Sequence, residues 1–289
     1  MKRKIATLLM ASALTAALIT ACGSGGEETS GESAEETTAE ETSGEESEEA
    51  SDGYVSAEDA VAAAKAGDTH VLDVREWANY VGGRVANSEW CPIFPLEDDS
   101  LAEAMTEYAD ANFGDDKDIY IICNSGAKGA EKATEVLTES GIDPSRLFTV
   151  EGGAKALAEV DGALTTNRTE ENIEWQYVSG EDAVAAVGDD EVQFLDVRDD
   201  ETYAAGHLEG SLQCNLKEIE DAEAQTQMYE LATGEMDPEK PVYILCYSGN
   251  NCAKTAISVM KDAGFDTDNL FIIEDGAKNA EVSAAFVTE

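Results

Sequence analysis

Short apolar runs alternate with alanine-rich stretches along residues 53–289 of this chain. Three runs rich in Val, Ile and Leu predict buried strands. The first run ends with the sequence Leu72-Asp-Val-Arg75, the second covers Asp118–Cys123 and the third covers Leu147–Val150. Between and after them, amphipathic or alanine-rich segments predict helices at about Leu96–Phe113 and Ala130–Ser140. Strands that alternate with helices predict an α/β fold with a mostly parallel sheet covered by helices on both faces.

The whole pattern occurs twice, at a constant offset of 123 positions without a gap. The offset pairs identical residues along the entire unit: Ser56 with Ser179, Asp73 with Asp196, Gly83 with Gly206, Cys91 with Cys214, Cys123 with Cys246, Leu147 with Leu270 and Gly153 with Gly276. The second copy therefore repeats the strands, at Leu195–Arg198, Val242–Cys246 and Leu270–Ile273, and the helices, at about Leu216–Thr233 and Cys252–Ala263. Ser56 and Ser179 each precede acidic residues and are predicted helix N-caps.

The repeat divides the folded part into two tandem domains. We predict domain 1 at residues 53–166, a linker at 167–176 and domain 2 at 177–289. Each domain is long enough to bury a hydrophobic core of its own.

The first 52 residues have a different character from the repeats. A basic start, Lys2-Arg3-Lys4, precedes an apolar run and then small residues before Cys22, which predicts a signal peptide at residues 1–21. The segment resembles a bacterial lipoprotein signal, in which Cys22 is lipidated; an ordinary cleaved signal with a chance cysteine is the alternative. Residues 23–52 carry twelve acidic residues and no Lys or Arg, which predicts a disordered tether beginning at Cys22.

The charge excludes several classes of partner. A formal net charge of −44 opposes binding to nucleic acid or to an anionic membrane surface, so we expect membrane attachment through the lipid anchor only. The chain has two histidines, His70 and His207, and no Cys-x-x-Cys motif, so a zinc site is not expected. No cofactor is predicted.

Two cysteines lie where an apolar strand turns into a helix. Cys123 and Cys246 occupy this place in the two copies, where free backbone N–H groups and the helix dipole stabilise an anion. They begin two short loops, Cys123-Asn124-Ser125-Gly126-Ala127-Lys128 and Cys246-Tyr247-Ser248-Gly249-Asn250-Asn251. Gly126 and Gly249 allow each backbone to curl inward, and Lys128 adds a cation that Asn251 does not supply.

The order of motifs resembles that of a rhodanese (thiosulfate sulfurtransferase) domain. The motifs are Asp-Val-Arg, Tyr-Ala-Ala-Gly-His-Leu-Glu-Gly at Tyr203–Gly210, a Cys-x-x-Gly loop, and Leu-Phe-x-x-Glu-x-Gly. The resemblance covers about residues 54–162 and 177–285. It implies that the loop cysteine accepts a sulfane sulfur as a persulfide and passes it to a thiol or to cyanide.

On this resemblance Cys123 is the principal nucleophile, and the second is Cys246. Lys128 takes the position where the family usually has Arg, which weakens bidentate recognition of an anion. A phosphatase would need Arg six residues after the cysteine, but Gly129 and Cys252 stand there, so we reject that activity.

Several polar residues are predicted to support the loops. The resemblance places Asp73 and Arg75, and likewise Asp196 and Arg198, at the rim of the loops, with structural ion pairs as the favoured interpretation. His207 is interpreted as a structural hydrogen-bonding residue. Cys91 and Cys214 are interpreted as small buried hydrophobic residues.

Cys252 has no counterpart in the first copy. It is either a small helix residue or a resolving cysteine that forms a disulfide with an oxidised or persulfidated Cys246, and the sequence leaves both open.

The sequence thus predicts a sulfurtransferase anchored by lipid on the extracytoplasmic face of the cell membrane. Its partners would be a small anionic sulfur donor and a thiol acceptor. The alternative is a non-catalytic or redox-sensing surface module of the same fold that binds a ligand or a partner protein.

Overall fold

A computed structural model describes residues 53–288. The predicted signal peptide, Cys22 and the acidic tether lie outside the described residues. Within residues 53–288, no helix is both long enough and apolar enough to span a membrane.

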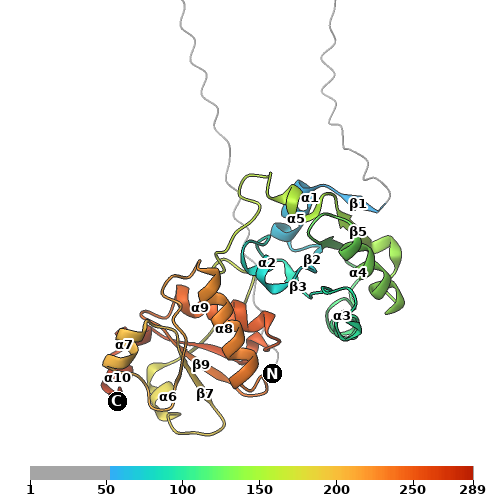
Figure 1. Cartoon of the computed structure of the whole chain (residues 1–289). Helices are drawn as coiled ribbons and strands as arrows, with labels where there is room; N and C mark the ends of the chain where they lie inside the picture. The colour runs from blue at the N-terminus through green and yellow to red at the C-terminus, as the bar shows by residue number, and fades with distance from the viewer. Residues whose placement is uncertain (1–52, 289) are drawn as a thin grey trace, which may run out of the picture. The chain divides into compact units, whose positions relative to one another are not determined.

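Each copy forms one five-stranded sheet in which every pair of neighbouring strands is parallel (Figure 1). The strand order is β1-β5-β4-β2-β3 in the first copy and β6-β10-β9-β7-β8 in the second. The strands of the first sheet are β1 (Tyr54–Val55), β2 (His70–Asp73), β3 (Glu89–Trp90), β4 (Ile119–Ile122) and β5 (Leu147–Val150). Those of the second are β6 (Gln176–Val178), β7 (Gln193–Asp196), β8 (Leu212–Gln213), β9 (Val242–Leu245) and β10 (Leu270–Ile273).

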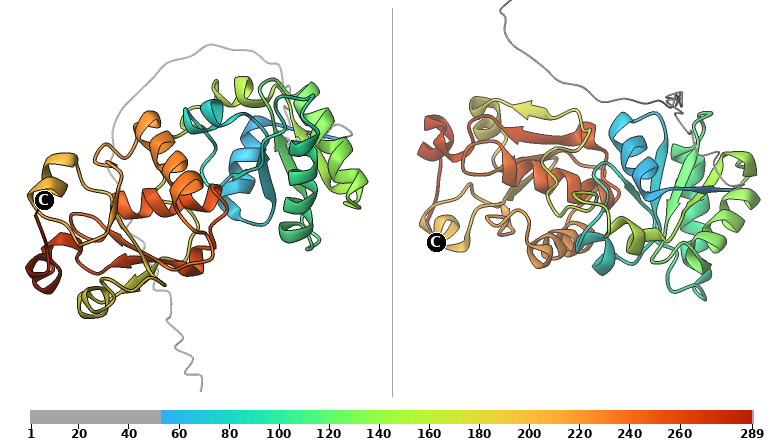
Figure 2. Two further views of the ribbon diagram at one scale, coloured as in Figure 1. Left: turned by 60° about the horizontal axis from the view of Figure 1, so that its bottom comes forward. Right: turned by 90° about the horizontal axis from the view of Figure 1, so that it is seen from above.

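Helices cover both faces of each sheet, as Figure 2 shows from two further directions. In the first copy they are α1 (Ala57–Ala66), α2 (Trp77–Val81), α3 (Asp99–Asn112), α4 (Lys128–Glu139) and α5 (Gly153–Leu157), with a 3₁₀ turn at Pro144–Arg146. In the second they are α6 (Gly180–Ala185), α7 (Asp200–Ala205), α8 (Ala222–Glu235), α9 (Asn251–Asp262) and α10 (Ala280–Ala284), with 3₁₀ turns at Thr267–Asn269 and Gly276–Lys278. The predicted α/β class with two tandem parallel sheets is confirmed.

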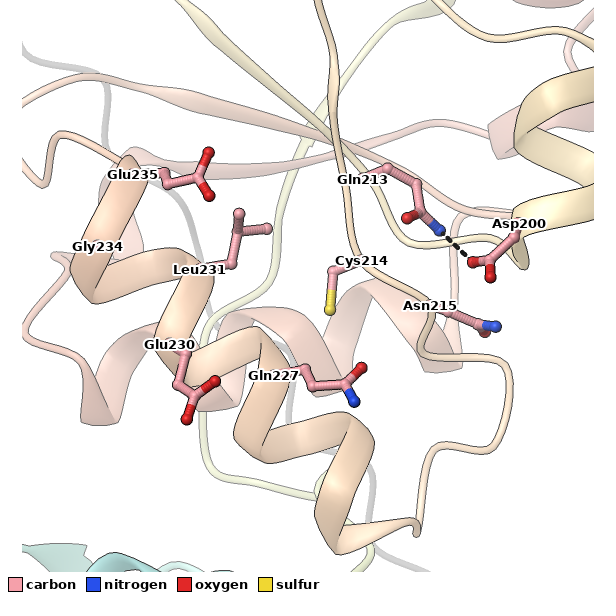
Figure 3. Close-up of a pocket in the computed structure, with 9 residues that line it drawn as sticks. All are labelled: Asp200, Gln213, Cys214, Asn215, Gln227, Glu230, Leu231, Gly234 and Glu235. Atoms are coloured by element: carbon pink, nitrogen blue, oxygen red, sulfur yellow. Dashed lines mark hydrogen bonds between the residues drawn. The ribbon is translucent and has the colours of Figure 1, made fainter.

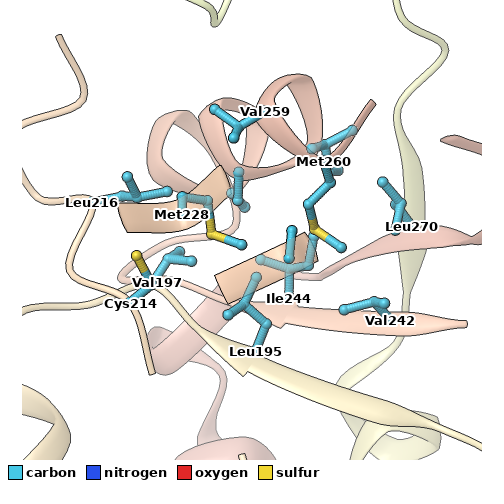
Figure 4. Packing of buried hydrophobic residues seen from close by; sticks show 14 of the residues in the cluster. Leu195, Val197, Cys214, Leu216, Met228, Val242, Ile244, Val259, Met260 and Leu270 are labelled. Atoms are coloured by element: carbon cyan, nitrogen blue, oxygen red, sulfur yellow. The ribbon is translucent and has the colours of Figure 1, made fainter. Parts of the chain in front are cut away.

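Two hydrophobic clusters form in each copy, one on each face of its sheet. In the second copy the larger cluster joins β7, β9 and β10 to α8 and α9 through residues such as Leu195, Ile244, Met228 and Met260 (Figure 4). In the first copy the corresponding cluster lies under α3 and α4, and α1 and α5 cover the opposite face. The nucleophile candidates Cys123 and Cys246 belong to the α3–α4 and α8–α9 clusters.

The predicted helix caps agree with the structure, and the predicted strand limits agree in part. Ser56 and Ser179 each accept a hydrogen bond from the third residue of the helix that follows. The strands at Leu147–Val150 and Leu270–Ile273 have the predicted limits. The strands before the cysteines end at Ile122 and Leu245, so both cysteines belong to the loops and not to the strands.

The long acidic helices begin later than predicted. Helix α3 starts at Asp99 and not near Leu96, and α8 starts at Ala222 and not near Leu216. The reason is side-chain capping, because Asp98 and Asp221 accept hydrogen bonds from Ser100 N and Glu223 N and so fix the first turn. Helix α8 also extends two residues beyond the predicted Thr233.

The segment predicted as a linker is held by buried arginines. Arg168 is fully buried; its Nε donates to Gln225 at 2.8 Å, and its Nη1 pairs with Asp262 at 2.5 Å. Glu171 pairs with the buried guanidinium of Arg84. Removal of one partner from such a pair leaves an unpaired buried charge and costs about 3–5 kcal/mol. The linker is therefore a fixed part of the fold, which its polar composition did not indicate.

Candidate active site

Cys123 lies at the carboxyl end of β4, the central strand of the first sheet, where ligands bind in parallel α/β sheets. The next four residues form the loop, and α4 begins at Lys128. No side chain caps this helix, so its first N–H groups face the loop. The second copy is built in the same way, with Cys246 after β9 and an uncapped α9.

Backbone N–H groups in the loops point at the cysteine sulfurs. Ala127 N donates to Cys123 Sγ at 3.3 Å, and Asn250 N donates to Cys246 Sγ at 3.2 Å. Both cysteines are 2 % exposed. An N–H group that donates to sulfur at the start of a helix is placed to stabilise negative charge on that sulfur.

Glycines fix the curl of each loop. Gly126 has φ of +63°, and a β-carbon there would lie 2.7 Å from Val150 O and 2.8 Å from Gly152 N. Gly249 has φ of +62°, and a β-carbon there would lie 2.8 Å from Ile273 O. Both the left-handed φ and the close approach of backbone therefore require glycine.

In each copy, the turn after the next strand, β5 or β10, donates a backbone hydrogen bond to the carbonyl oxygen of the loop cysteine. We call this contact the clamp. Ala154 N donates to Cys123 O at 2.8 Å, and Ala277 N donates to Cys246 O at the same distance. Gly153 and Gly276 precede these donors, and a β-carbon on either would collide with the cysteine carbonyl oxygen. The main chain of this turn thus holds the nucleophile in place.

The remaining loop residues form an open rim. Ser125, Lys128, Ser248, Asn250 and Asn251 are exposed, Asn124 and Tyr247 are half-buried, and Ala127 is exposed. Lys128 is the first residue of α4, so it belongs to the same helix end that supplies the N–H groups.

The Asp-Val-Arg motifs form internal ion pairs. Arg75 Nε lies 2.9 Å from Asp73 Oδ1, and Arg75 Nη2 lies 2.6 Å from Asp73 Oδ2 and donates to Gly83 O at 2.8 Å. Burial is the largest influence on Asp73 and raises the pKa of its carboxyl, against the lowering effect of Arg75. Asp196 and Arg198 repeat this arrangement with Gly206 O. The geometry fits the structural interpretation of these pairs.

His207 lies against the Tyr203 ring, with centroids 4.0 Å apart, and its Nδ1 is 3.1 Å from Tyr203 O. Cys91 and Cys214 are buried, and burial raises the pKa of their thiols to about 12 and about 11. His207, Cys91 and Cys214 thus lie in packed surroundings in the structure.

The sequence analysis missed a polar cluster beside the second loop. Tyr247 Oη donates to Asp199 Oδ2 at 2.6 Å, and Lys217 Nζ donates to the same oxygen at 2.9 Å. These hydrogen bonds, that of Tyr247 first, hold the pKa of Asp199 well below its usual value. Tyr247 was visible as a loop residue, but nothing in the sequence indicated that Asp199 and Lys217 would meet it.

A separate pocket of about 510 Å³ opens between β8 and α8 (Figure 3). Cys214 points its sulfur toward it, and Gln227, Glu230 and Glu235 line the helix side. Its lining includes no residue of the Cys246 loop. Across residues 53–288, no group of His, Cys, Asp and Glu side chains is arranged to hold a metal ion.

A model of the rhodanese-like domain matches residues 56–159 and again residues 179–281. The chain belongs to the rhodanese-like family. Both matched segments contain one cysteine loop each, so the family assignment covers more than half of the chain and both candidate sites.

Solved structures similar to the chain include two sulfurtransferases. A thiosulfate sulfurtransferase from Pseudomonas aeruginosa is 16% identical, with 81% of this chain and 43% of that chain covered and a TM-score of 0.37. A 3-mercaptopyruvate sulfotransferase from Escherichia coli is 18% identical, with 78% and 98% covered and a TM-score of 0.33. A rhodanese-like domain from Anabaena is 18% identical, with 40% and 81% covered and a TM-score of 0.31.

Proposed function

We propose that the chain transfers a sulfane sulfur from an anionic donor such as thiosulfate to a thiol or cyanide acceptor, through a persulfide on Cys123 or Cys246. The observation that carries the proposal is the N–H bond to each cysteine sulfur, made by a loop whose backbone is fixed by glycines. The membership in the rhodanese-like family supports the reaction class.

The reaction proceeds in two displacement steps. The Cys123 thiolate attacks the outer sulfur of thiosulfate, the S–S bond of the donor breaks, and sulfite leaves with the electron pair. An acceptor thiolate or cyanide then attacks the outer sulfur of the persulfide, and the Cys123 thiolate leaves. The loop N–H groups stabilise the thiolate before the first step and the persulfide anion after it.

Lys128 has the role of attracting the donor. It is the first residue of α4, directly after the loop, and the chain as a whole carries a net charge of −44 that repels anions. A local cation is therefore needed more in this protein than in a neutral one. The chemistry resides on cysteine sulfur and requires no cofactor.

The test is sulfur uptake by the purified chain. Intact-mass analysis after incubation with thiosulfate should show added sulfur on the wild type and none on the Cys123→Ser/Cys246→Ser double variant. Peptide mapping should place the sulfur on the loop cysteines. Sulfur uptake by the double variant, or no uptake by the wild type from thiosulfate or an organic polysulfide, would contradict the proposal.

We also propose that the mature protein is held at the extracytoplasmic face of the cell membrane through lipid on Cys22. The support is the basic start, the apolar run and the small residues before Cys22. One acyl chain binds a membrane only reversibly, so stable anchoring needs more than one chain. The wild type should fractionate with membranes and a Cys22→Ala variant should not; soluble wild type without acyl mass on Cys22 would refute the anchor.

A further inference from the structure

One of the differences between the two copies is a pair of positions next to the loop cysteine. In the first copy, a β-carbon on Gly129 would lie 2.5 Å from Phe94 Cε2 and 3.0 Å from Cys123 Cβ. Glycine is therefore required there, because the Phe94 ring fills the space. The equivalent positions in the second copy are Cys252 and Lys217, so both members of the pair have changed.

The change at Lys217 leaves room for the side chain of Cys252. Lys217 directs its ammonium to Asp199 Oδ2 at 2.9 Å, and its side chain is 57 % exposed. The substitution of Lys for Phe thus accompanies the gain of a thiol next to the nucleophile.

Cys246 and Cys252 belong to one hydrophobic cluster. In the first copy, a β-carbon built on Gly129 would lie 3.0 Å from Cys123 Cβ, so the repeat places the β-carbon of Cys252 close to that of Cys246. Disulfides need about 3.5–4.5 Å between β-carbons, so a slight separation of the pair gives bonding range. Burial first, and then the charge of Cys246, raises the pKa of the Cys252 thiol to about 11. All five cysteines in residues 53–288 are free thiols in the structure.

We propose that Cys252 is a resolving cysteine that converts a persulfide on Cys246 into a Cys246–Cys252 disulfide and releases the sulfane sulfur as hydrosulfide. This activity rests on the proposed function, because it needs the persulfide. It makes the second copy a sulfide-releasing unit, whereas the first copy, with Gly129, keeps its persulfide for an external acceptor.

The step balances without a further reactant. Cys252 Sγ attacks Cys246 Sγ, the bond from Cys246 Sγ to the outer sulfur breaks, and its electron pair leaves with the outer sulfur. The anionic outer sulfur of the persulfide first takes the proton of the Cys252 thiol, so the attacking Cys252 thiolate forms without a separate base and the outer sulfur leaves as hydrosulfide. Counted from two thiols and a sulfane sulfur, each cysteine sulfur loses one electron and the sulfane sulfur gains two. Repeated turnover requires an external dithiol to reduce the disulfide.

The experiment isolates the second loop. The full chain with Cys123→Ser is reduced, freed of thiol and given thiosulfate or an organic polysulfide. We expect a burst of about one sulfide per chain, and a Cys246–Cys252 disulfide in a non-reducing peptide map. Cys123→Ser/Cys252→Ser should release no sulfide and keep the added sulfur on Cys246, and Cys123→Ser/Cys252→Ala covers the case in which a buried serine impairs folding. Cys123→Ser/Cys214→Ser, which removes another buried cysteine of the same cluster, should behave as Cys123→Ser.

Two results would overturn the proposals in different ways. A stable persulfide on Cys246 in the Cys123→Ser protein, without sulfide or disulfide, would refute the role of Cys252 and leave sulfur transfer intact. No sulfur uptake by any of these variants from either donor would refute sulfur transfer at Cys246, and the inference with it.

Discussion

The two cysteine loops share a backbone and differ in their side chains. The glycines that curl them have φ of +63° and +62°, and the clamping hydrogen bonds to the cysteine carbonyls are both 2.8 Å long. The side chains around them have changed at several positions: Lys128 corresponds to Asn251, Gly129 to Cys252, Phe94 to Lys217 and Asn124 to Tyr247. The two copies therefore share the backbone groups that hold the loop cysteine, and they differ in the side chains that surround its sulfur.

The cations of the two loops have different surroundings. Lys128 is the exposed first residue of α4. Lys217 is paired with Asp199, which also accepts a hydrogen bond from Tyr247, so its charge is neutralised locally. We therefore expect the first loop to be the better site for an anionic donor.

The largest expected effect separates the two nucleophiles. With thiosulfate as donor and cyanide as acceptor, we expect Cys123→Ser to lower kcat/KM by about tenfold or more, which is at least about 1.4 kcal/mol. In the Cys123→Ser variant only the second loop can react. That loop has no free cation, and its Cys246 is converted into a disulfide that cyanide does not reduce. Cys246→Ser should retain most of the activity. The opposite ranking would contradict the assignment of Cys123 as the principal nucleophile.

Gly126→Ala should disable the first loop through its backbone. The new β-carbon would meet Val150 O at 2.7 Å in a left-handed conformation, so we expect a loss of about 1–3 kcal/mol in the free energy of unfolding and no persulfide on Cys123. Gly141→Ala is the matched control, because Gly141 has φ of +97° but no atom within 4 Å of the added carbon. The control should lose stability and keep sulfur uptake; equal uptake by both variants would show that the loop tolerates a side chain.

An exchange of charge between the loops tests the role of Lys128. We expect Lys128→Asn to lower kcat/KM for thiosulfate at the first loop by roughly fivefold, or about 1 kcal/mol, and Asn251→Lys to improve sulfur uptake by Cys246. Both effects should shrink as salt is added, because exposed charges are screened. Lys128→Arg should preserve or raise the rate, since a guanidinium binds two oxygens at once. Identical kinetics for Lys, Arg and Asn would remove Lys128 from the donor site.

The smallest expected effect is a pH dependence of the stability. It comes from His70, at the end of the strands opposite the cysteine loops. His70 at the start of β2 is 2.6 Å from Glu89 and 3.0 Å from Asp115, and the hydrogen bond with Glu89 is the main cause that raises its pKa above 6.5. Its stabilisation is fully present below pH 6.5 and is lost as pH rises through the raised pKa of the folded state. The equivalent Gln193 bonds the backbone of Asp237 and does not titrate.

Urea unfolding between about pH 5 and pH 9 measures this difference. The wild type should lose stability across the upper part of that range, and His70→Gln, which copies the second repeat, should lose less. A His70→Gln protein with the same pH profile as the wild type would show that the ion pairs of His70 contribute nothing.

The sequence was sufficient for the fold because the signals were local and occurred twice. Alternation of apolar runs with helical segments fixed the strands, and the offset of 123 fixed the boundaries of the repeat. The starts of α3 and α8 were misplaced although Asp98 and Asp221 carry the capping signal, because the apolar pattern was extended past them to Leu96 and Leu216.

The parts of the site that could not be predicted depend on contacts between distant residues. Asp199, Lys217 and Tyr247 come from three separate segments, and only the fold brings their side chains together. The burial of Arg168 and Glu171 in a polar linker is of the same kind. The sequence showed that Cys252 stands where the first copy has Gly129. It did not show that the Phe94 ring is the reason why Gly129 must be glycine.

The clamp on the cysteine carbonyl has a consequence for engineering. Ala154 and Ala277 hold Cys123 and Cys246 through main-chain atoms alone, so the clamp does not depend on which side chains the loop carries. The units to exchange are residues 123–129 with Phe94, and residues 246–252 with Lys217 and Asp199. The sulfur chemistry of one repeat could then be installed in the other without redesign of either sheet.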